Sequence, residues 1–188
     1  MLLVAGVTAS VLIQTMNSLQ EQALKTGTET IRDISTGIKV THVSGYYNGT
    51  ALSQIAIFVT PIVASQDIDM SYSYVTMSDS TQEKILNYNS SVFSSTISDG
   101  LFGTLTSGDL NEDEFGIIVV RDIDSSITDT SPIINNGDLI VLLVNSSTTF
   151  SGIGTRTEVT GSIILEYGIR GVINFMTPSA FSDTIIDL

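Results

Sequence analysis

Carboxylate and hydroxyl side chains alternate in one short segment of this 188-residue sequence. The segment RDIDSS, residues 121–126, places Asp122, Asp124 and Ser126 at every second position. A loop that turns at this spacing can direct several oxygen atoms at one hard cation, such as Ca2+ or Mg2+. We therefore expect a divalent cation as a cofactor, bound within residues 107–138, with these three residues among its ligands.

A second acidic cluster, Asp109 with Glu112, Asp113 and Glu114, lies just upstream. The 121–126 segment lacks the glycine and the distal glutamate of an EF-hand loop at the required positions. The chain carries 20 Asp and Glu residues against seven Lys and Arg, so acidic clusters also arise in it by chance. The competing interpretation of both clusters is a solvated loop.

Three Asn-x-Ser/Thr sequences offer sites for N-glycosylation. The acceptor residues are Asn48, Asn89 and Asn145. Such a sequence is used when it lies on a surface loop of an exported protein. A chain rich in Ser and Thr also generates the pattern by chance, so these three residues are candidate acceptors only.

Little in the sequence predicts an enzyme or a nucleic-acid-binding protein. It has no cysteine and a single histidine, His42, which we expect to be structural or at the surface. Nucleophile-elbow, zinc-helix and phosphate-loop motifs are absent. The net charge is −13 and the basic residues are scattered, so no basic stripe can neutralise phosphates. We predict neither catalysis nor binding of nucleic acid.

The elements that would position these residues fall into two parts, a helix at 1–37 and a β-domain at 38–188. From Leu2 to Ile13 the chain is apolar, but this run is shorter than the about 20 residues that span a bilayer. Apolar residues then recur at steps of three and four as far as Ile38, which predicts one continuous helix. Small residues near its start would let helices approach closely. The residues expected to pack between helices are Ala5, Gly6, Ala9, Leu12, Met16, Leu19 and Ala23.

A helix of this length would extend roughly 55–60 Å, which exceeds the width of a small domain. One end must therefore project from the rest of the chain. A projecting end that is apolar on all sides must enter a membrane or pack against copies of itself. The alternative is a helix buried within one globule.

After Gly37 the sequence period changes to that of strands. Segments rich in Val, Ile, Tyr, Phe and Thr are separated by turn-like clusters such as Asn48-Gly49. Seven to nine strands without intervening helices indicate an antiparallel sandwich or barrel, which we expect to be immunoglobulin-like. Residues 78–114 are expected to form a Ser-rich excursion with one or two short strands. The strands expected are 38–47, 52–60, 70–77, 115–120, 139–145, 157–167 and 170–176.

The order of motifs along the chain resembles that of the archaeal flagellins, or archaellins. An apolar helix leads into a Leu-Gln-x-x-Ala-x-x-Thr-Gly stretch and then into the first strand. Residues 115–145 also look like a segment of that family. The remaining similar segments are VAGVTASVLIQT (4–15), LQEQALKTG (19–27), STGIKV (35–40), RTEV (156–159), EYG (166–168), FMTPS (175–179) and the terminal IIDL.

The resemblance implies a structural subunit of the archaeal motility filament, located outside the cell. In this family the helices bundle along the filament axis, the β-domains cover the outside, and the same helix lies in the membrane before assembly. N-glycosylation and a metal site in the outer domain are compatible with the family. The family's basic leader and the first part of its helix do not occur in this sequence, so we expect an N-terminally truncated chain.

Two other functions compete with that of a filament subunit. A pilus-like adhesin, or a minor protein that anchors filaments to the envelope, would share the helix and the sandwich. An exported sugar-binding or hydrolytic sandwich would need clustered aromatic or catalytic side chains, but the sequence has no Trp and 7% aromatic residues. The expected partners are therefore copies of this chain or related subunits in a helical polymer, and the membrane before assembly.

Overall fold

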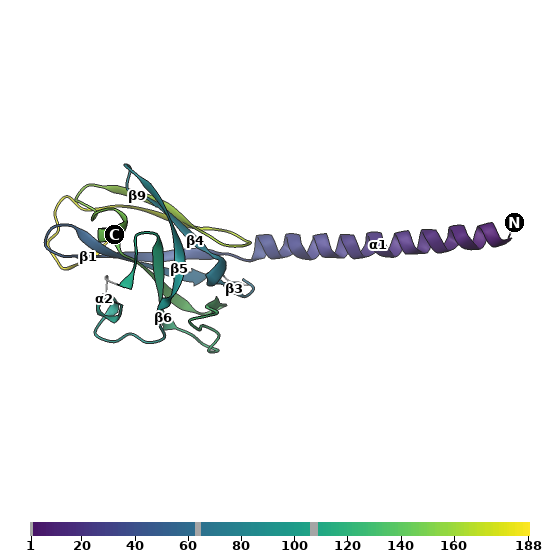
Figure 1. Cartoon of the computed structure of the whole chain (residues 1–188), viewed down its shortest axis with the longest axis horizontal. Coiled ribbons are helices and arrows are strands. Elements are labelled where there is room, and N and C mark those ends of the chain that lie inside the picture. Colours follow the sequence, from purple (N-terminus) through teal and green to yellow (C-terminus); the bar gives the residue numbers. More distant parts are fainter. Residues whose placement is uncertain (1, 63–64, 106–108) are drawn as a thin grey trace.

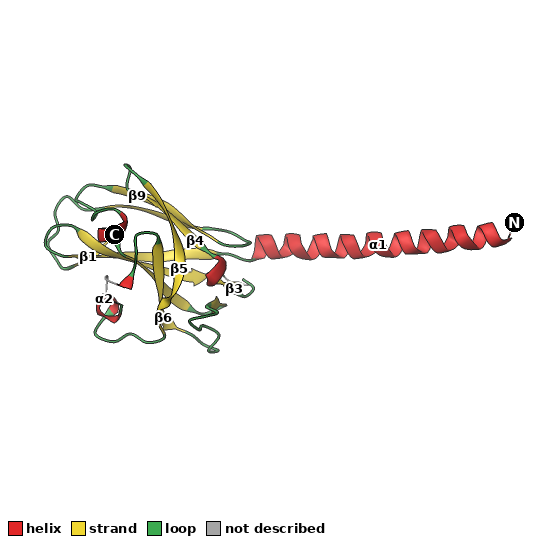
Figure 2. Cartoon of the chain, viewed as in Figure 1, coloured by secondary structure: helices red, strands yellow, loops and turns green. Residues whose placement is uncertain are grey.

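A computed structural model describes residues 2–62, 65–105 and 109–188. The first two positions of the range 107–138, in which a cation site is expected, lie outside the described residues. The chain forms one long helix followed by a β-rich domain, as the sequence predicts (Figures 1 and 2). The N-terminus lies at the far end of the helix, and the C-terminus lies in the β-domain.

Helix α1 (Leu2–Ser35) extends away from the β-domain as a single rod (Figure 1). Its 34 residues span about 50 Å at 1.5 Å per residue. Every residue from 4 to 31 is exposed, so the alternative of a helix buried in the globule is wrong. In the described part of the chain, no helix combines the length and the hydropathy needed to cross a bilayer.

The β-domain is built from eleven strands in the described residues. A 3-10 turn (Met70–Tyr72) and two four-residue helices, α2 (Leu101–Thr104) and α3 (Ser146–Thr149), lie between them. The strands are β1 (Ile38–Tyr47), β2 (Leu52–Pro61), β3 (Ile68–Asp69), β4 (Tyr74–Ser78), β5 (Glu83–Ser94), β6 (Glu114–Arg121), β7 (Ile133–Ile134), β8 (Leu139–Val144), β9 (Glu158–Ile164), β10 (Gly171–Met176) and β11 (Ile185–Asp187).

Nine of these strands form one sheet in the order β10-β9-β4-β5-β6-β8-β2-β1-β11, and β3 pairs with β7. The sheet rolls up, because β1 also contacts β10 and Gly37 forms a bridge with Ile169. This sandwich or barrel-like arrangement is the predicted one. One pair departs from the antiparallel expectation: β5 and β6 run parallel, because the excursion between them returns the chain to the starting end of β5.

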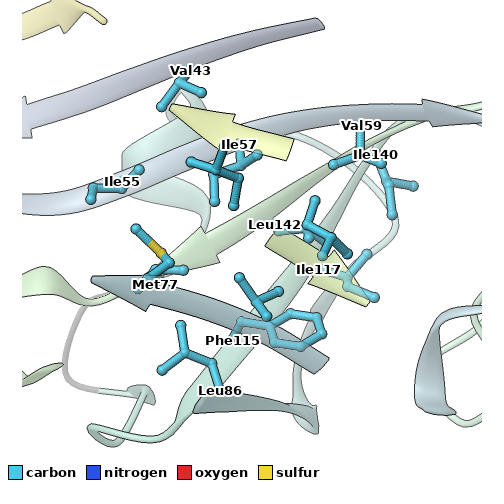
Figure 3. Packing of buried hydrophobic residues seen from close by; sticks show 14 of the residues in the cluster. Val43, Ile55, Ile57, Val59, Met77, Leu86, Phe115, Ile117, Ile140 and Leu142 are labelled. Carbon is cyan, nitrogen blue, oxygen red and sulfur yellow. The ribbon is translucent and has the colours of Figure 1, made fainter. Parts of the chain in front are cut away.

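Aliphatic side chains fill the inside of the rolled sheet. Strand β8 is apolar at every position, because Ile140 and Leu142 face this interior while Val141 and Leu143 face a second cluster on the outside. In the second cluster, Val92, Leu105 and Leu110, together with Leu101 and Phe102, cover the outer face of β2, β6 and β8. Figure 3 shows side chains of the interior, among them Ile57, Val59, Met77, Leu86, Phe115, Ile117, Ile140 and Leu142.

Candidate functional site

The first candidate site is the surface of α1. All seven residues expected to pack between helices lie on this helix, and all are exposed. The large side chains are far from buried: Leu12 is 63% exposed, Met16 68% and Leu19 59%. An apolar surface of this extent is stable in water only when another molecule covers it.

Threonine hydroxyls on α1 are satisfied within the helix. The Thr8 hydroxyl donates to the Val4 carbonyl oxygen at 3.0 Å, and the Thr15 hydroxyl donates to the Val11 carbonyl oxygen at 2.8 Å. A hydroxyl bonded in this way can face an apolar partner without losing a hydrogen bond. The helix is therefore compatible with an apolar partner at Thr8 and Thr15 too, which the hydrophobic pattern alone does not indicate.

Gly6 has no structural role inside this chain. A Cβ atom built on it would have no heavy atom within 4 Å apart from the helix's own neighbouring backbone. A glycine inside a helix costs about 1 kcal/mol relative to alanine. The described structure offers nothing that offsets this cost, whereas a close contact with another helix would use the missing side chain.

The end of α1 is firmly attached to the β-domain. The Arg32 guanidinium lies 3.4 Å from the centre of the Tyr167 ring, a cation–π contact. The Ile169 N–H donates to the Thr36 carbonyl oxygen at 2.9 Å, and a Cβ on Gly168 would lie 2.5 Å from that same oxygen. These contacts fix the direction in which α1 leaves the domain.

The second candidate site is an acidic loop between β6 and β8. Carboxylate oxygens of Asp122, Asp124 and Asp138 lie within 4.8 Å of one another. Asp122 and Asp124 are two of the three predicted ligands, and Asp138, which is fully buried, is a residue that the sequence analysis missed. A signal was present: Asp138 ends the turn-like cluster that starts at Asn135, directly before a predicted strand.

Backbone N–H groups hold these carboxylates in place. Asp122 accepts from Ser125 at 2.8 Å and from Ile127 at 3.1 Å. Asp138 accepts from Ile123 at 3.2 Å and from Asn135 at 3.0 Å. The loop is thus closed around its acidic side chains, and carboxylate lone pairs remain for a further ligand.

Ser126, the third predicted ligand, has other partners. Its hydroxyl donates to the Ile133 carbonyl oxygen at 2.8 Å, and its N–H donates to Asp124 at 3.1 Å. Hydrogen bonds from Ser126 and Asn135 hold the pKa of Asp124 below its ordinary value. In the described structure, Ser126 therefore positions Asp124, and the prediction that it binds a cation directly stays untested.

The other acidic cluster is largely engaged by neighbouring side chains. The Lys84 ammonium lies 3.3 Å from Glu112 and 3.9 Å from Asp113. Glu114 accepts from the Asn89 amide at 2.8 Å, and this bond is the main cause that lowers the pKa of Glu114. Within residues 2–62, 65–105 and 109–188, the three aspartates of the β6–β8 loop are the one group of acidic side chains with metal-binding spacing.

The three candidate glycosylation residues lie in different environments. Asn48 is exposed in the turn between β1 and β2, where its side-chain oxygen accepts from the Thr50 N–H at 3.0 Å. Asn89 is half-buried and donates its amide to Glu114, as described above. Asn145 is 3% exposed and caps the start of α3 by accepting from the Ser147 N–H. Of these amides, that of Asn48 is the most accessible to an enzyme.

His42 is a structural residue at the surface, as expected. Its Nε2 lies 2.8 Å from the Ser44 hydroxyl, and its Nδ1 lies 3.4 Å from a carboxylate oxygen of Asp187 in β11. The ring also packs against Phe58. The contact with Asp187 joins the C-terminal strand β11 to β1, and the contact with Phe58 joins β1 to β2.

Comparison with known proteins gives consistent results. Residues 1–175 match the archaeal-type flagellin family. The chain is 37% identical to flagellin B2 of Methanocaldococcus jannaschii over 186 residues, which cover 98% of this chain and 86% of that protein. The fold is similar to the crystal structure of archaeal flagellin FlaB1 from the same organism, with a TM-score of 0.74 and 30% identity over 81% of this chain and 96% of that one. It is also similar to the chain in the archaeal flagellum of Methanospirillum hungatei, with a TM-score of 0.68 and 13% identity over 98% and 92% of the two chains.

Proposed function

Because the chain belongs to the archaeal-type flagellin family, we propose that it is a structural subunit of the archaeal motility filament, without a catalytic role. The observation that carries the proposal is α1, a rod about 50 Å long with an exposed apolar surface. Copies of α1 would bury this surface against one another in the filament core, and the β-domain would lie outside, in the medium. Contacts between different surfaces of neighbouring copies generate a helical polymer when the rotation between copies does not close into a ring.

Before assembly, the same apolar surface would be shielded by the cell membrane. Val4, Val7 and Val11 are each more than half exposed, and such side chains favour the acyl region of a bilayer over water. One surface would thus serve first as a membrane segment and then as an interface between helices.

Electron microscopy of the source cells would test the proposal. An antibody raised against residues 45–188, detected with gold particles, is expected to label surface filaments along their whole length. Label confined to filament bases or to the bare envelope would instead favour the minor, envelope-anchoring protein, and filaments without label would contradict both functions.

We also propose a divalent cation bound by Asp122, Asp124 and Asp138. The support is electrostatic: three carboxylates lie together, and none of the ion pairs formed by described residues includes them. A cation such as Ca2+ would offset their mutual repulsion with oxygen ligands of the type that it prefers. Ser126 would then either hold Asp124 in position or supply its own oxygen as a further ligand of the cation.

Calorimetric titration of chelator-treated protein with CaCl2 and MgCl2 would test the cation site. We expect saturable heat with at least one of these salts, and a loss of affinity of tenfold or more in Asp124→Asn. Asp129→Asn is the matched control, because Asp129 is exposed on the same loop but lies outside the group of three. Absence of heat at millimolar metal would contradict the site.

For N-glycosylation, the accessible amide leads us to propose Asn48 as the acceptor. In protein purified from the source cells, the attached glycan mass should fall by one glycan in Asn48→Gln and remain unchanged in Asn145→Gln. An unchanged glycan mass in Asn48→Gln would contradict the assignment.

A further inference from the structure

The two outer faces of the rolled sheet differ. Val92, Leu101, Phe102, Leu105 and Leu110 cover the face formed by β2, β6 and β8. The face formed by the outward residues of β10, β9, β4 and β5, here called the open sheet face, has no such cover among the residues that the structure describes. Val172 and Met176 are each 64% exposed on it and Ile85 is 55% exposed, while Tyr74 is partly exposed beside them.

Strand register arranges the open sheet face in rows. Val172 is paired with Ser162, Ser162 with Thr76, and Thr76 with Ile85, so one row crosses all four strands. In the middle of this row the hydroxyls of Thr76 and Ser162 are bonded to each other at 3.0 Å. The polar groups at the centre of this row therefore bond to each other, whereas the next row, which contains Asn174, Thr160 and Ser78, is polar.

The open sheet face also carries little charge. The chain has a net charge of −13, which makes copies repel one another. Among the outward residues of these four strands, all of which the structure describes, only Glu83 and Glu158 are charged, and each is the first residue of its strand. A different surface of a neighbouring copy can thus approach this face without meeting many like charges on it.

The open sheet face continues to the base of α1. Strand β10 starts two residues after Ile169, which forms the bridge with Gly37 at the end of the helix. Because the contacts of Arg32 and Thr36 fix α1 to the domain, helices that bundle would place neighbouring β-domains side by side in one repeated orientation. The surface is therefore continuous with the proposed helix interface.

We propose that the open sheet face is a lateral contact between β-domains of neighbouring copies of this chain, an inference that rests on the proposed filament function. Four strands of five residues cover on the order of 300 Å2, from about 4.8 Å per strand and 3.4 Å per residue. A standard stable interface buries about 800 Å2 on each partner. The contact is thus too small to hold two free domains together, and it acts when the helices already tether them.

The test is Val172→Glu in the full-length subunit, expressed in the source cells as their only copy. We expect the variant filaments to form but to dissociate under milder conditions than filaments of the unaltered chain. After the same heating, the filament pellet should contain several-fold less protein than that of the unaltered chain. Ile185→Glu is the matched control: Ile185 is 60% exposed on β11, the other edge strand, and lies outside the open sheet face. This control should leave the filament pellet unchanged.

Each outcome is decisive. Val172→Glu filaments as stable as those of the unaltered chain would overturn the inference, as would an equal loss in Ile185→Glu. If Val172→Glu fails to accumulate, Thr160→Glu repeats the test, because Thr160 is exposed on the same face in β9. Absence of filaments from the unaltered chain would overturn the proposed function and this inference with it. If the unaltered chain forms normal filaments, the variants test the open sheet face alone.

Discussion

Gly6→Leu is expected to abolish or strongly reduce filament assembly while leaving the folded subunit intact. The space where the new side chain would lie is empty in the described structure, so the chain itself accommodates leucine. In a bundle, the same side chain would hold two helices apart at the point where Ala5, Gly6 and Ala9 allow close approach. The loss would therefore appear only in the assembled state.

This substitution separates packing from helix stability. Leucine is a better helix former than glycine by up to about 1 kcal/mol, so Gly6→Leu should strengthen α1 as a helix. Weaker assembly could not then be attributed to an unwound α1. Gln20→Leu, which adds the same side chain where the amphipathic pattern is polar, is the matched control and should retain assembly.

The measurement is the number and length of surface filaments in negatively stained cells, together with the thermal unfolding of purified subunits followed by circular dichroism. Normal filaments from Gly6→Leu would show that the small residues of α1 do not mark its contact surface. Loss of filaments in Gln20→Leu as well would mean that any added bulk on the helix disturbs assembly.

Elements with a clear period were predictable from the sequence. Residues 2–35 keep the spacing of a helix, and strands β2, β6 and β8 each contain an apolar run that follows turn residues. Strand β5 was not recognised as a twelve-residue strand, because only Leu86 and Val92 are buried in it. Pairing with β4 on one side and with β6 on the other holds it, and such long-range pairing has no local signal.

The start of β4 shows the opposite error. The alternation from Met70 onward predicts a strand, but the structure forms a 3-10 turn first, and β4 begins at Tyr74. The Asp69 carboxylate accepts hydrogen bonds from both the N–H and the hydroxyl of Ser71, which stabilises the turn. A capping side chain outweighed the alternating pattern here.

The candidate sites were predictable only in part, because contacts between distant strands leave no local pattern in the sequence. Asp122 and Asp124 share a local pattern, whereas Asp138 joins them because β6 and β8 pair and bring the two ends of the connecting loop together. The sequence around Asn145 matches a glycosylation signal, but the residue is buried as a helix cap. Local spacing reports which residue types are near each other and does not report burial or partners from distant strands.

Without α1, residues 36–188 are expected to fold alone and to remain monomeric, whereas the full chain associates. The cut is placed after Ser35 because Thr36 is fully buried and Ile38 belongs to the core. Removal of the helix deletes the Arg32–Tyr167 contact and the bond from the Thr36 N–H to the Arg32 carbonyl oxygen. Together these are worth roughly 2 kcal/mol, so the unfolding midpoint should fall by only about 4–8 °C.

Size-exclusion chromatography with light scattering and a thermal melt would measure both properties. The apolar surface that drives association would be gone, and the open sheet face is too small to replace it. A fragment that aggregates, or that unfolds without cooperativity, would mean that α1 contributes to the core of the domain. A stable dimer of the fragment would instead mean that the β-domains bind one another without the helix, so that filament growth would begin with the outer domains and not with α1.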